Sequence, residues 1–395
     1  MPQTPSPLYR ETLDLLCEKL VADEATIGTA FPYVTQPDGG WALMPASLSA
    51  GYRGANWDHG NWFCGFWVGL LLAAHLHSKD EKWLALARER MLLVNQRAED
   101  GNTHDIGFIF LSSAVPFYRL TGEAQYREIA LKAAARLRDR LVVTRQGAYI
   151  SSWGPMSDPR GRASSAIDTM ANIPLLYWAA RESGDASFLL AGEAHARMTD
   201  HAFTRPDLTL YHAVEYDTKS GERLRGYTFQ GLSDESSWSR GTGWSVYGLA
   251  ATAGATGDRR YLDRAGEIAD KWLGQLGDAV VPPWDFNDTA PNAPEDSSAS
   301  AIMAAALTDM ARMHPDEAEQ RKWQSAADRL LEGLCTDYLA REASHRGLLK
   351  HACYSKPHNV GKDSAVMFGD YFFVEALMRQ LAPDVFSIRH QPILG

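Results

Sequence analysis

The chain has 395 residues, of which 45% are hydrophobic and 22% are charged, a composition typical of a globular protein with a large core. Its formal net charge is −10 and no stripe of Lys and Arg appears, which argues against a nucleic-acid partner. The most apolar run, 62–76, is too short to span a bilayer and contains two glycines, so we expect no membrane segment.

The N-terminus and the cysteines indicate where the protein works. The first residues lack the basic segment followed by an apolar stretch that marks an export signal. The four Cys lack CxxC spacing, which favours reduced thiols over a disulfide framework or a zinc site. We therefore expect a cytoplasmic protein. No Pro/Ser-rich linker or charge block divides the chain, so residues 1–395 are expected to form a single domain.

Apolar residues that recur every three to four positions predict about twelve helices. These are expected at 7–22, 62–77, 80–96, 107–120, 123–142, 165–182, 185–203, 238–255, 258–276, 297–313, 318–340 and 366–381. Strand signals are weak and limited to pieces near 140–152, 208–216 and 223–228.

A short turn recurs between the predicted helices, as in Thr121-Gly122-Glu123, Ser183-Gly184-Asp185 and Thr256-Gly257-Asp258. Gly suits the end of one helix and an acid suits the first turn of the next. Helices paired in this way predict an all-α fold, a six-hairpin (α/α)6 barrel (toroid) with short β pieces in its rim loops. Its long connections would gather the polar and aromatic clusters on one rim.

Two carboxylates attract attention because each stands where a polar loop meets an apolar run: Asp105 in HDIGF and Asp168 in SSAIDTM. Asp is a good helix cap, and taken singly either residue fits that use. A carboxyl beside apolar groups should instead have a raised pKa, which suits a general acid. Several of the 12 Trp, such as Trp62, Trp153 and Trp284, also stand near loop ends, which indicates surfaces for stacking on flat rings.

A family resemblance rests on long motifs that occur in order along 31–377. They are NWFCGFW (61–67), HDIGF (104–108), SSAIDTMANIPLLYWAA (164–180), QGLSDESSWSRGTGWSVYG (230–248), PPWDF (282–286), DSSASA (296–301) and GDYFFVEAL (369–377). On these motifs the chain resembles the unsaturated glucuronyl hydrolases of glycoside hydrolase family 88. The resemblance implies an α/α barrel, no metal or other cofactor, and action on the 4,5-unsaturated uronic acid that polysaccharide lyases leave at the non-reducing end.

The implied reaction is hydration of the C4=C5 enol ether, for which one carboxyl that gives a proton and helps to deliver water can suffice. By resemblance Asp168 has that role, and Asp105 is the second functional carboxylate. The residues implied to bind the substrate are Trp62, His104, His212, Gln230, Arg240, Trp244 and Tyr354. Arg240 would pair with the uronate carboxylate, although an ion pair with Asp234 or Glu235 explains it equally well.

The loop 350–363 departs from the family pattern because it is rich in potential cations. Lys356 and Lys362 suggest contact with an anionic distal sugar, and a solvated loop is the alternative interpretation. Two rival functions also remain open: an unsaturated rhamnogalacturonyl hydrolase of family 105, acting on pectin fragments, and a glycan-binding toroid without catalysis. The expected partner is an unsaturated oligosaccharide, most simply a disaccharide. The sequence leaves its polysaccharide source, its sulfation and the oligomeric state open.

Overall fold

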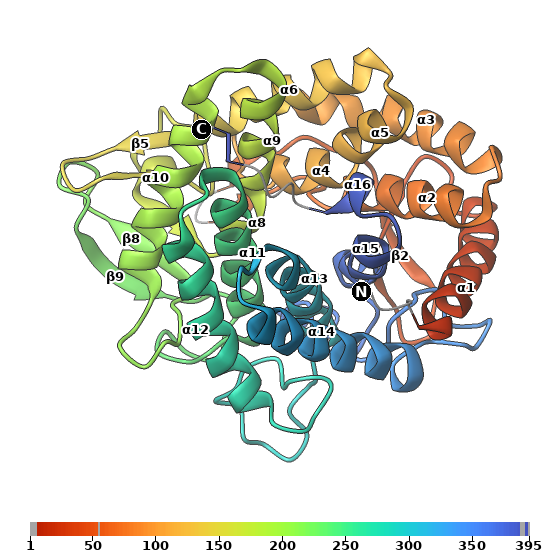
Figure 1. Cartoon of the computed structure of the whole chain (residues 1–395). Coiled ribbons are helices and arrows are strands. Elements are labelled where there is room, and N and C mark those ends of the chain that lie inside the picture. Colours follow the sequence, from red (N-terminus) through yellow and green to blue (C-terminus); the bar gives the residue numbers. More distant parts are fainter. Residues whose placement is uncertain (1–5, 54–55, 388–391, 394–395) are drawn as a thin grey trace.

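Two concentric rings of helices form a toroid in the computed structural model, which describes residues 6–53, 56–387 and 392–393 (Figure 1). The inner ring contains α2 (Cys64–Ser78), α4 (Ile106–Ser112), α5 (Ala114–Thr121), α8 (Thr169–Asn172), α9 (Pro174–Ser183), α11 (Ser239–Thr256), α13 (Ser297–Met313) and α15 (Met367–Leu381). The outer ring contains α1 (Pro7–Glu24), α3 (Lys82–Val94), α6 (Ala124–Arg138), α10 (Ala186–Phe203), α12 (Arg259–Leu276) and α14 (Glu317–Asp337). The ring closes because α15 packs against both α13 and α2. The expected (α/α)6 fold is confirmed.

The sequence of each helix explains its ring. Inner helices such as α11 and α13 consist largely of small and apolar residues and are buried along almost their whole length. Outer helices such as α12 and α14 bury one apolar stripe and expose a charged face. Of the helices in the part of the chain that the structure describes, none combines the length and apolar content that a bilayer crossing requires.

The recurring turns join the end of an inner helix to the start of an outer one. Gly122, Gly184 and Gly257 end α5, α9 and α11 with φ of 71°, 73° and 72°, a conformation that favours glycine. Asp185 and Asp258 then cap α10 and α12 by accepting hydrogen bonds from backbone N–H groups. Because these tight turns lie at the carboxyl ends of the inner helices, the long connections all enter at their amino ends.

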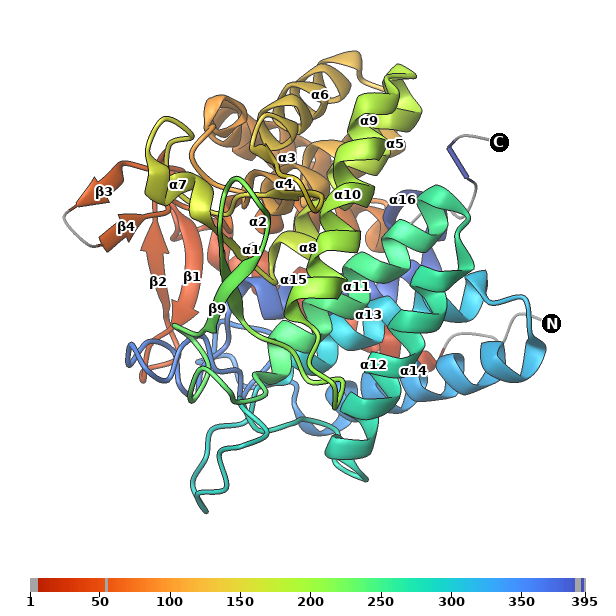
Figure 2. The ribbon, with the colours of Figure 1, turned by 90° about the vertical axis from the view of Figure 1, so that its left-hand side faces the viewer.

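The long connections carry short antiparallel strands at one rim. They are β1 (Phe31–Thr35), β2 (Trp41–Met44), β3 (Gly51–Arg53), β4 (Asn56–Asp58), β5 (Leu141–Val143), β6 (Ala148–Ile150), β7 (Ser164–Ala166), β8 (Ala213–Tyr216) and β9 (Arg223–Tyr227). Short helices η1 (Asn95–Glu99), α7 (Pro159–Ala163) and α16 (Pro383–Phe386) complete the connections. Figure 2 shows β1 to β4 and β9 on its left and α14 on its right.

Two helices predicted as continuous are interrupted, and the prediction was wrong there. The segment 107–120 divides at Ser113, because Pro116 has no N–H for the carbonyl four residues earlier and its ring would clash there. The segment 165–182 begins instead as strand β7, which pairs with β8, and Pro174 separates α8 from α9. The hairpins β1/β2 and β3/β4 were not anticipated, whereas β5, β6, β8 and β9 fall in the predicted pieces.

Candidate active site

A pocket opens where the amino ends of the inner helices meet the long rim connections. Its lining consists of His59, Trp62, His104, Asp105, Phe108, Trp153, Asp168, Phe229, Gln230, Arg240, Trp244, Tyr354 and Phe368. Both predicted carboxylates are therefore in one pocket, together with most of the predicted substrate-binding residues. Helix amino ends carry partial positive charge, so this location favours bound anions and ionised carboxylates.

Asp105 immediately precedes α4, yet its side chain makes no capping hydrogen bond to that helix. One carboxylate oxygen, Oδ2, accepts a 2.8 Å hydrogen bond from Thr103 Oγ1, and Oδ1 lies 3.1 Å from His104 Nε2. His59 Nδ1 is 3.7 Å from Oδ2. Burial disfavours the charged form of Asp105, but His104 and His59 outweigh it, and together they hold the pKa well below its usual range. The prediction of a raised pKa is wrong for this residue, which stays ionised.

His104 supports Asp105 from a fixed position. Its Nδ1 lies 2.5 Å from Thr169 Oγ1, and its Nε2 faces Asp105, so both ring nitrogens have partners within the protein. Thr169 in turn contacts the hydroxyl of Ser152 at 3.0 Å. Although His104 lines the pocket, these contacts make it a residue that positions Asp105.

Asp168 immediately precedes α8, and it too makes no capping bond through its side chain. The side chain is 17% exposed, and its Oδ2 is 3.8 Å from Nε2 of the buried His212. Burial lowers the pKa of His212, and the nearby carboxylate of Asp168 only partly opposes this. His212 is therefore a neutral ring in contact with Asp168, rather than a member of a charged pair.

Asn172 joins the two turns that carry the carboxylates. Its Nδ2 donates to the backbone carbonyl of Asp168 at 3.0 Å, and its Oδ1 accepts from the backbone N–H of Phe108 at 2.5 Å. Gly107 permits this contact, because a Cβ there would lie 2.6 Å from both the Cβ and the backbone oxygen of Asn172. The spacing between Asp105 and Asp168 thus depends on a glycine and a buried amide.

Arg240 lines the pocket, and its guanidinium is held by partners within the protein. Its Nη1 donates to the carboxylate of Asp296, which is fully buried, and to the carbonyl of Cys353 at 2.7 Å. Its Nη2 donates to the carbonyl of Tyr354 at 2.6 Å and faces Gln230 Oε1 at 3.4 Å. Neither terminal nitrogen is left for the bidentate uronate pairing that the sequence suggested, and the ion-pair partner is Asp296 rather than Asp234 or Glu235. Arg240 holds the loop that carries Tyr354, and it fixes Gln230 at the pocket wall.

Aromatic rings form the walls and floor. Trp62 donates from Nε1 to the hydroxyl of Tyr354 at 3.2 Å and stacks on Phe368 with 5.3 Å between ring centroids. Trp244 packs between Phe108 and Phe372, 5.0 and 4.9 Å from their centroids, so it is both floor and core. Sequence reasoning gave no role to Phe108, Phe229 or Phe368. Of these three, only Phe108 could have been found from the sequence, because it follows Asp105 by three residues and side chains at that spacing lie on the same face of a helix.

Lys356 and Lys362 lie outside this pocket, in an open hollow that they line with His351, Asp363 and the segment 292–295. Lys356 pairs with Asp288 at 2.5 Å, and His351 contacts Asp363 at 2.7 Å. Two of the potential cations in this loop thus have an acidic partner. Lys362 lines the same hollow and has no ion pair within the described residues.

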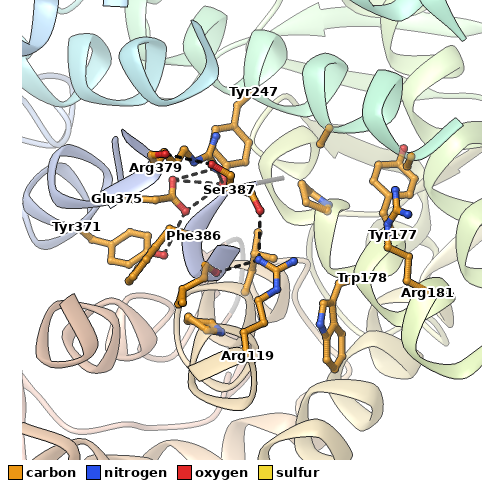
Figure 3. Close-up of a pocket in the computed structure, with 16 residues that line it drawn as sticks. Arg119, Tyr177, Trp178, Arg181, Tyr247, Tyr371, Glu375, Arg379, Phe386 and Ser387 are labelled. Atoms are coloured by element: carbon orange, nitrogen blue, oxygen red, sulfur yellow. Dashed lines mark hydrogen bonds and ion pairs between the residues drawn. The ribbon is translucent and has the colours of Figure 1, made fainter. Parts of the chain in front are cut away.

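A second pocket lies between the inner helices farther along their length (Figure 3). It contains Glu375, which Arg379 approaches to 3.2 Å and which accepts hydrogen bonds from Tyr247 and Tyr371. Arg379 also pairs with Asp309 at 2.6 Å. Burial raises the pKa of Glu375, and these contacts join α11, α13 and α15. In the described ranges, no group of three His, Cys, Asp or Glu side chains converges as metal ligands would.

Comparison with known proteins decides the family. The chain is 32% identical over 332 residues to the unsaturated glucuronyl hydrolase of Bacillus sp. (strain GL1), an alignment that covers 82% of this chain and 86% of the relative. It is 31% identical over 330 residues to the unsaturated chondroitin disaccharide hydrolase of Streptococcus pneumoniae (strain ATCC BAA-255 / R6), covering 82% of each chain. The chain belongs to the unsaturated glucuronyl hydrolase family.

Solved structures agree with this assignment. The crystal structure of the unsaturated glucuronyl hydrolase from Bacillus sp. GL1, responsible for the degradation of glycosaminoglycan, superposes with a TM-score of 0.86 at 27% identity. The superposition covers 97% of this chain and 99% of that one. No model of a known protein family matches the chain. As a member of this family the protein is a glycosidase, and the carboxylate pocket at the rim is its candidate active site.

Proposed function

We propose that the enzyme releases the 4,5-unsaturated uronic acid from the non-reducing end of lyase-generated oligosaccharides, and that Asp168 is the general acid. The observation that carries this proposal is that Asp105 and Asp168 line one aromatic-walled pocket, with the buried ring of His212 beside Asp168 and neither carboxylate used as a helix cap. Flat walls suit the flattened ring of an unsaturated sugar. The amino ends of the inner helices favour its carboxylate.

In the proposed reaction, the carboxyl group of Asp168 gives its proton to C4 of the enol ether. The resulting centre at C5 is oxocarbenium-like, and a water molecule adds there. The carboxylate of Asp168 takes the proton that this water loses, so the acid is regenerated. The product is a hemiketal, which opens and expels the rest of the oligosaccharide.

Asp105 has a complementary role in this proposal. Its carboxylate is ionised, because Thr103, His104 and His59 surround it with donors and positive potential. An ionised acceptor cannot donate a proton, which leaves Asp168 as the acid. Asp105 offers a fixed negative charge to the oxocarbenium-like centre and an acceptor for sugar hydroxyl groups.

The test is the absorbance of the conjugated uronate, which disappears on hydration. Wild-type protein should remove the absorbance of unsaturated disaccharides, which would be tested as a panel from hyaluronan, chondroitin, heparin and rhamnogalacturonan. The relative rates would show which source it prefers. Asp168→Asn should reduce kcat by on the order of 10²–10⁴ and leave binding by calorimetry intact, because the amide keeps the shape but not the acidic proton.

A matched control is Asp185→Asn, the same change at a residue that caps α10. It should leave turnover unaltered. Retention of more than half the wild-type rate in Asp168→Asn would exclude Asp168 as the acid. A wild-type protein that binds the disaccharides without bleaching them would be a glycan-binding toroid, and bleaching of rhamnogalacturonan fragments alone would favour action on pectin.

A further inference from the structure

The proton on the His212 ring is located by its neighbours on the β8/β9 hairpin. His212 directly precedes β8, and Thr228 directly follows β9, so antiparallel pairing of Ala213 with Tyr227 brings the two residues together. Thr228 Oγ1 lies 2.9 Å from His212 Nδ1. The same hydroxyl oxygen accepts the backbone N–H of Gly231 at 2.7 Å.

A threonine hydroxyl has one proton to donate. The oxygen of Thr228 accepts the N–H of Gly231 through one lone pair, and its hydroxyl proton is free to point at His212 Nδ1. The backbone N–H groups of Phe229 and Gln230 also point at Nδ1, from 3.5 and 3.4 Å. Donors thus surround Nδ1, and the only ring position left for a proton in the neutral imidazole is Nε2.

His212 Nε2 is buried and has no hydrogen-bond partner among the described residues. The nearest acceptor is Asp168 Oδ2, at 3.8 Å. Catalytic hydrogen bonds are often long before substrate binds and shorten in the complex. The charged and titratable groups around this ring are Asp168, Arg240 and His104, and burial keeps the pKa of His212 below its usual value.

We infer that Thr228 is a positioning residue that fixes His212 as the Nε2–H tautomer, so that His212 is a permanent hydrogen-bond donor toward Asp168 and never a base. This inference rests on the proposed function. While Asp168 gives its proton to C4 and later takes one from water, His212 neither gains nor loses a proton. Its N–H stabilises the carboxylate form of Asp168 between the two steps.

Three variants test the inference. Thr228→Val removes the hydroxyl at nearly constant shape, Thr228→Ser keeps it, and Thr144→Val removes a comparable hydroxyl bond, to Gly147, in the β5/β6 hairpin. In Thr228→Val, only the long backbone contacts remain at Nδ1. We expect kcat to fall about 3- to 10-fold with little change in KM, which corresponds to the loss of one hydrogen bond. Thr228→Ser should restore kcat, and Thr144→Val should not alter it.

The second readout is the ¹⁵N NMR spectrum of the His212 ring, which reports the tautomer without substrate. Wild type and Thr228→Ser should show the Nε2–H form, and Thr228→Val should show a mixture. A wild-type ring protonated at Nδ1 would overturn the inference even if no variant folds, as would a normal kcat and tautomer in a folded Thr228→Val. Absence of turnover in wild type with the Nε2–H tautomer present would instead refute the proposed function and leave the assignment of Thr228 standing.

Discussion

Substitution of Gly107 by Ala is the most direct test of how the two carboxylates are spaced. A Cβ at this position would lie 2.6 Å from the Cβ and the backbone oxygen of Asn172 and 2.7 Å from its Cα. These distances are about 0.8 Å shorter than ordinary van der Waals contact, and backbone atoms cannot turn aside as a flexible side chain can. The amino end of α4 and the carboxyl end of the short helix α8, where Asn172 lies, must therefore move apart.

The size of the effect follows from that displacement. Misplacement by about 1 Å can cost on the order of 10²-fold in rate, and overpacking costs about 1–3 kcal/mol of folding free energy. Ala favours a helix over Gly by about 1 kcal/mol, which reduces the net loss of stability but not the displacement. We expect kcat in the absorbance assay to fall about 10²-fold, with a smaller loss of stability in urea unfolding.

Gly101→Ala is the matched control, since nothing lies within 4 Å of a Cβ at that position in the same connection. It should leave kcat and stability nearly unchanged. A Gly107→Ala enzyme with wild-type kcat would refute the reasoning, because α4 and α8 would then have separated without any effect on the paired carboxylates.

Three further predictions concern the charges around the pocket. Because the folded-state pKa of Asp105 is lowered, its ionised form stabilises the fold above the unfolded pKa of about 3.9, and this stabilisation is lost as pH falls through the folded pKa. The difference in Tm between wild type and Asp105→Asn should therefore be largest near pH 7 and shrink below pH ~4. A Tm difference that does not change with pH would contradict the lowered pKa. Arg240→Ala should lower both the activity and the free energy of unfolding, the latter by about 3–5 kcal/mol, because it leaves the buried carboxylate of Asp296 without its ion-pair partner. A rise in KM at unchanged Tm would instead support pairing of Arg240 with the uronate carboxylate. Lys362→Ala should raise KM several-fold for sulfated disaccharides and leave KM for unsulfated ones unchanged, and added salt should have the same effect. Lys356→Ala should raise KM less, because Asp288 already pairs with Lys356. Equal changes in KM for both substrates would mean that this loop does not select for charge.

The fold was predictable because its signals are local. Apolar spacing located the helices, and turns such as Ser183-Gly184-Asp185 have a left-handed glycine and a capping acid within three residues. The interruptions at Ser113 and Ile173 were missed because helical periodicity continues across them, although Pro116 and Pro174 were present to signal the breaks.

The sequence identified most residues of the site, but not their charge states or their ion-pair partners. Motif resemblance named Asp105 and Arg240, yet whether a carboxyl is protonated depends on the groups that surround it. His59 reaches Asp105 from a distant connection, and the Arg240–Asp296 pair spans 56 positions. Such long-range contacts leave no periodic trace in a sequence, so the lowered pKa of Asp105 and the structural use of Arg240 emerged only from the folded chain.

The closure of the inner ring by α15 against α2 has a consequence for synthesis of the protein on the ribosome. Trp62, just before α2, meets Tyr354 across 292 positions of sequence, and it stacks on Phe368 in the first turn of α15. A nascent chain that has not yet released α15 already contains both carboxylates but lacks one wall of the sugar pocket. Domains generally fold as units. Catalytic competence therefore requires that α15 dock against α2.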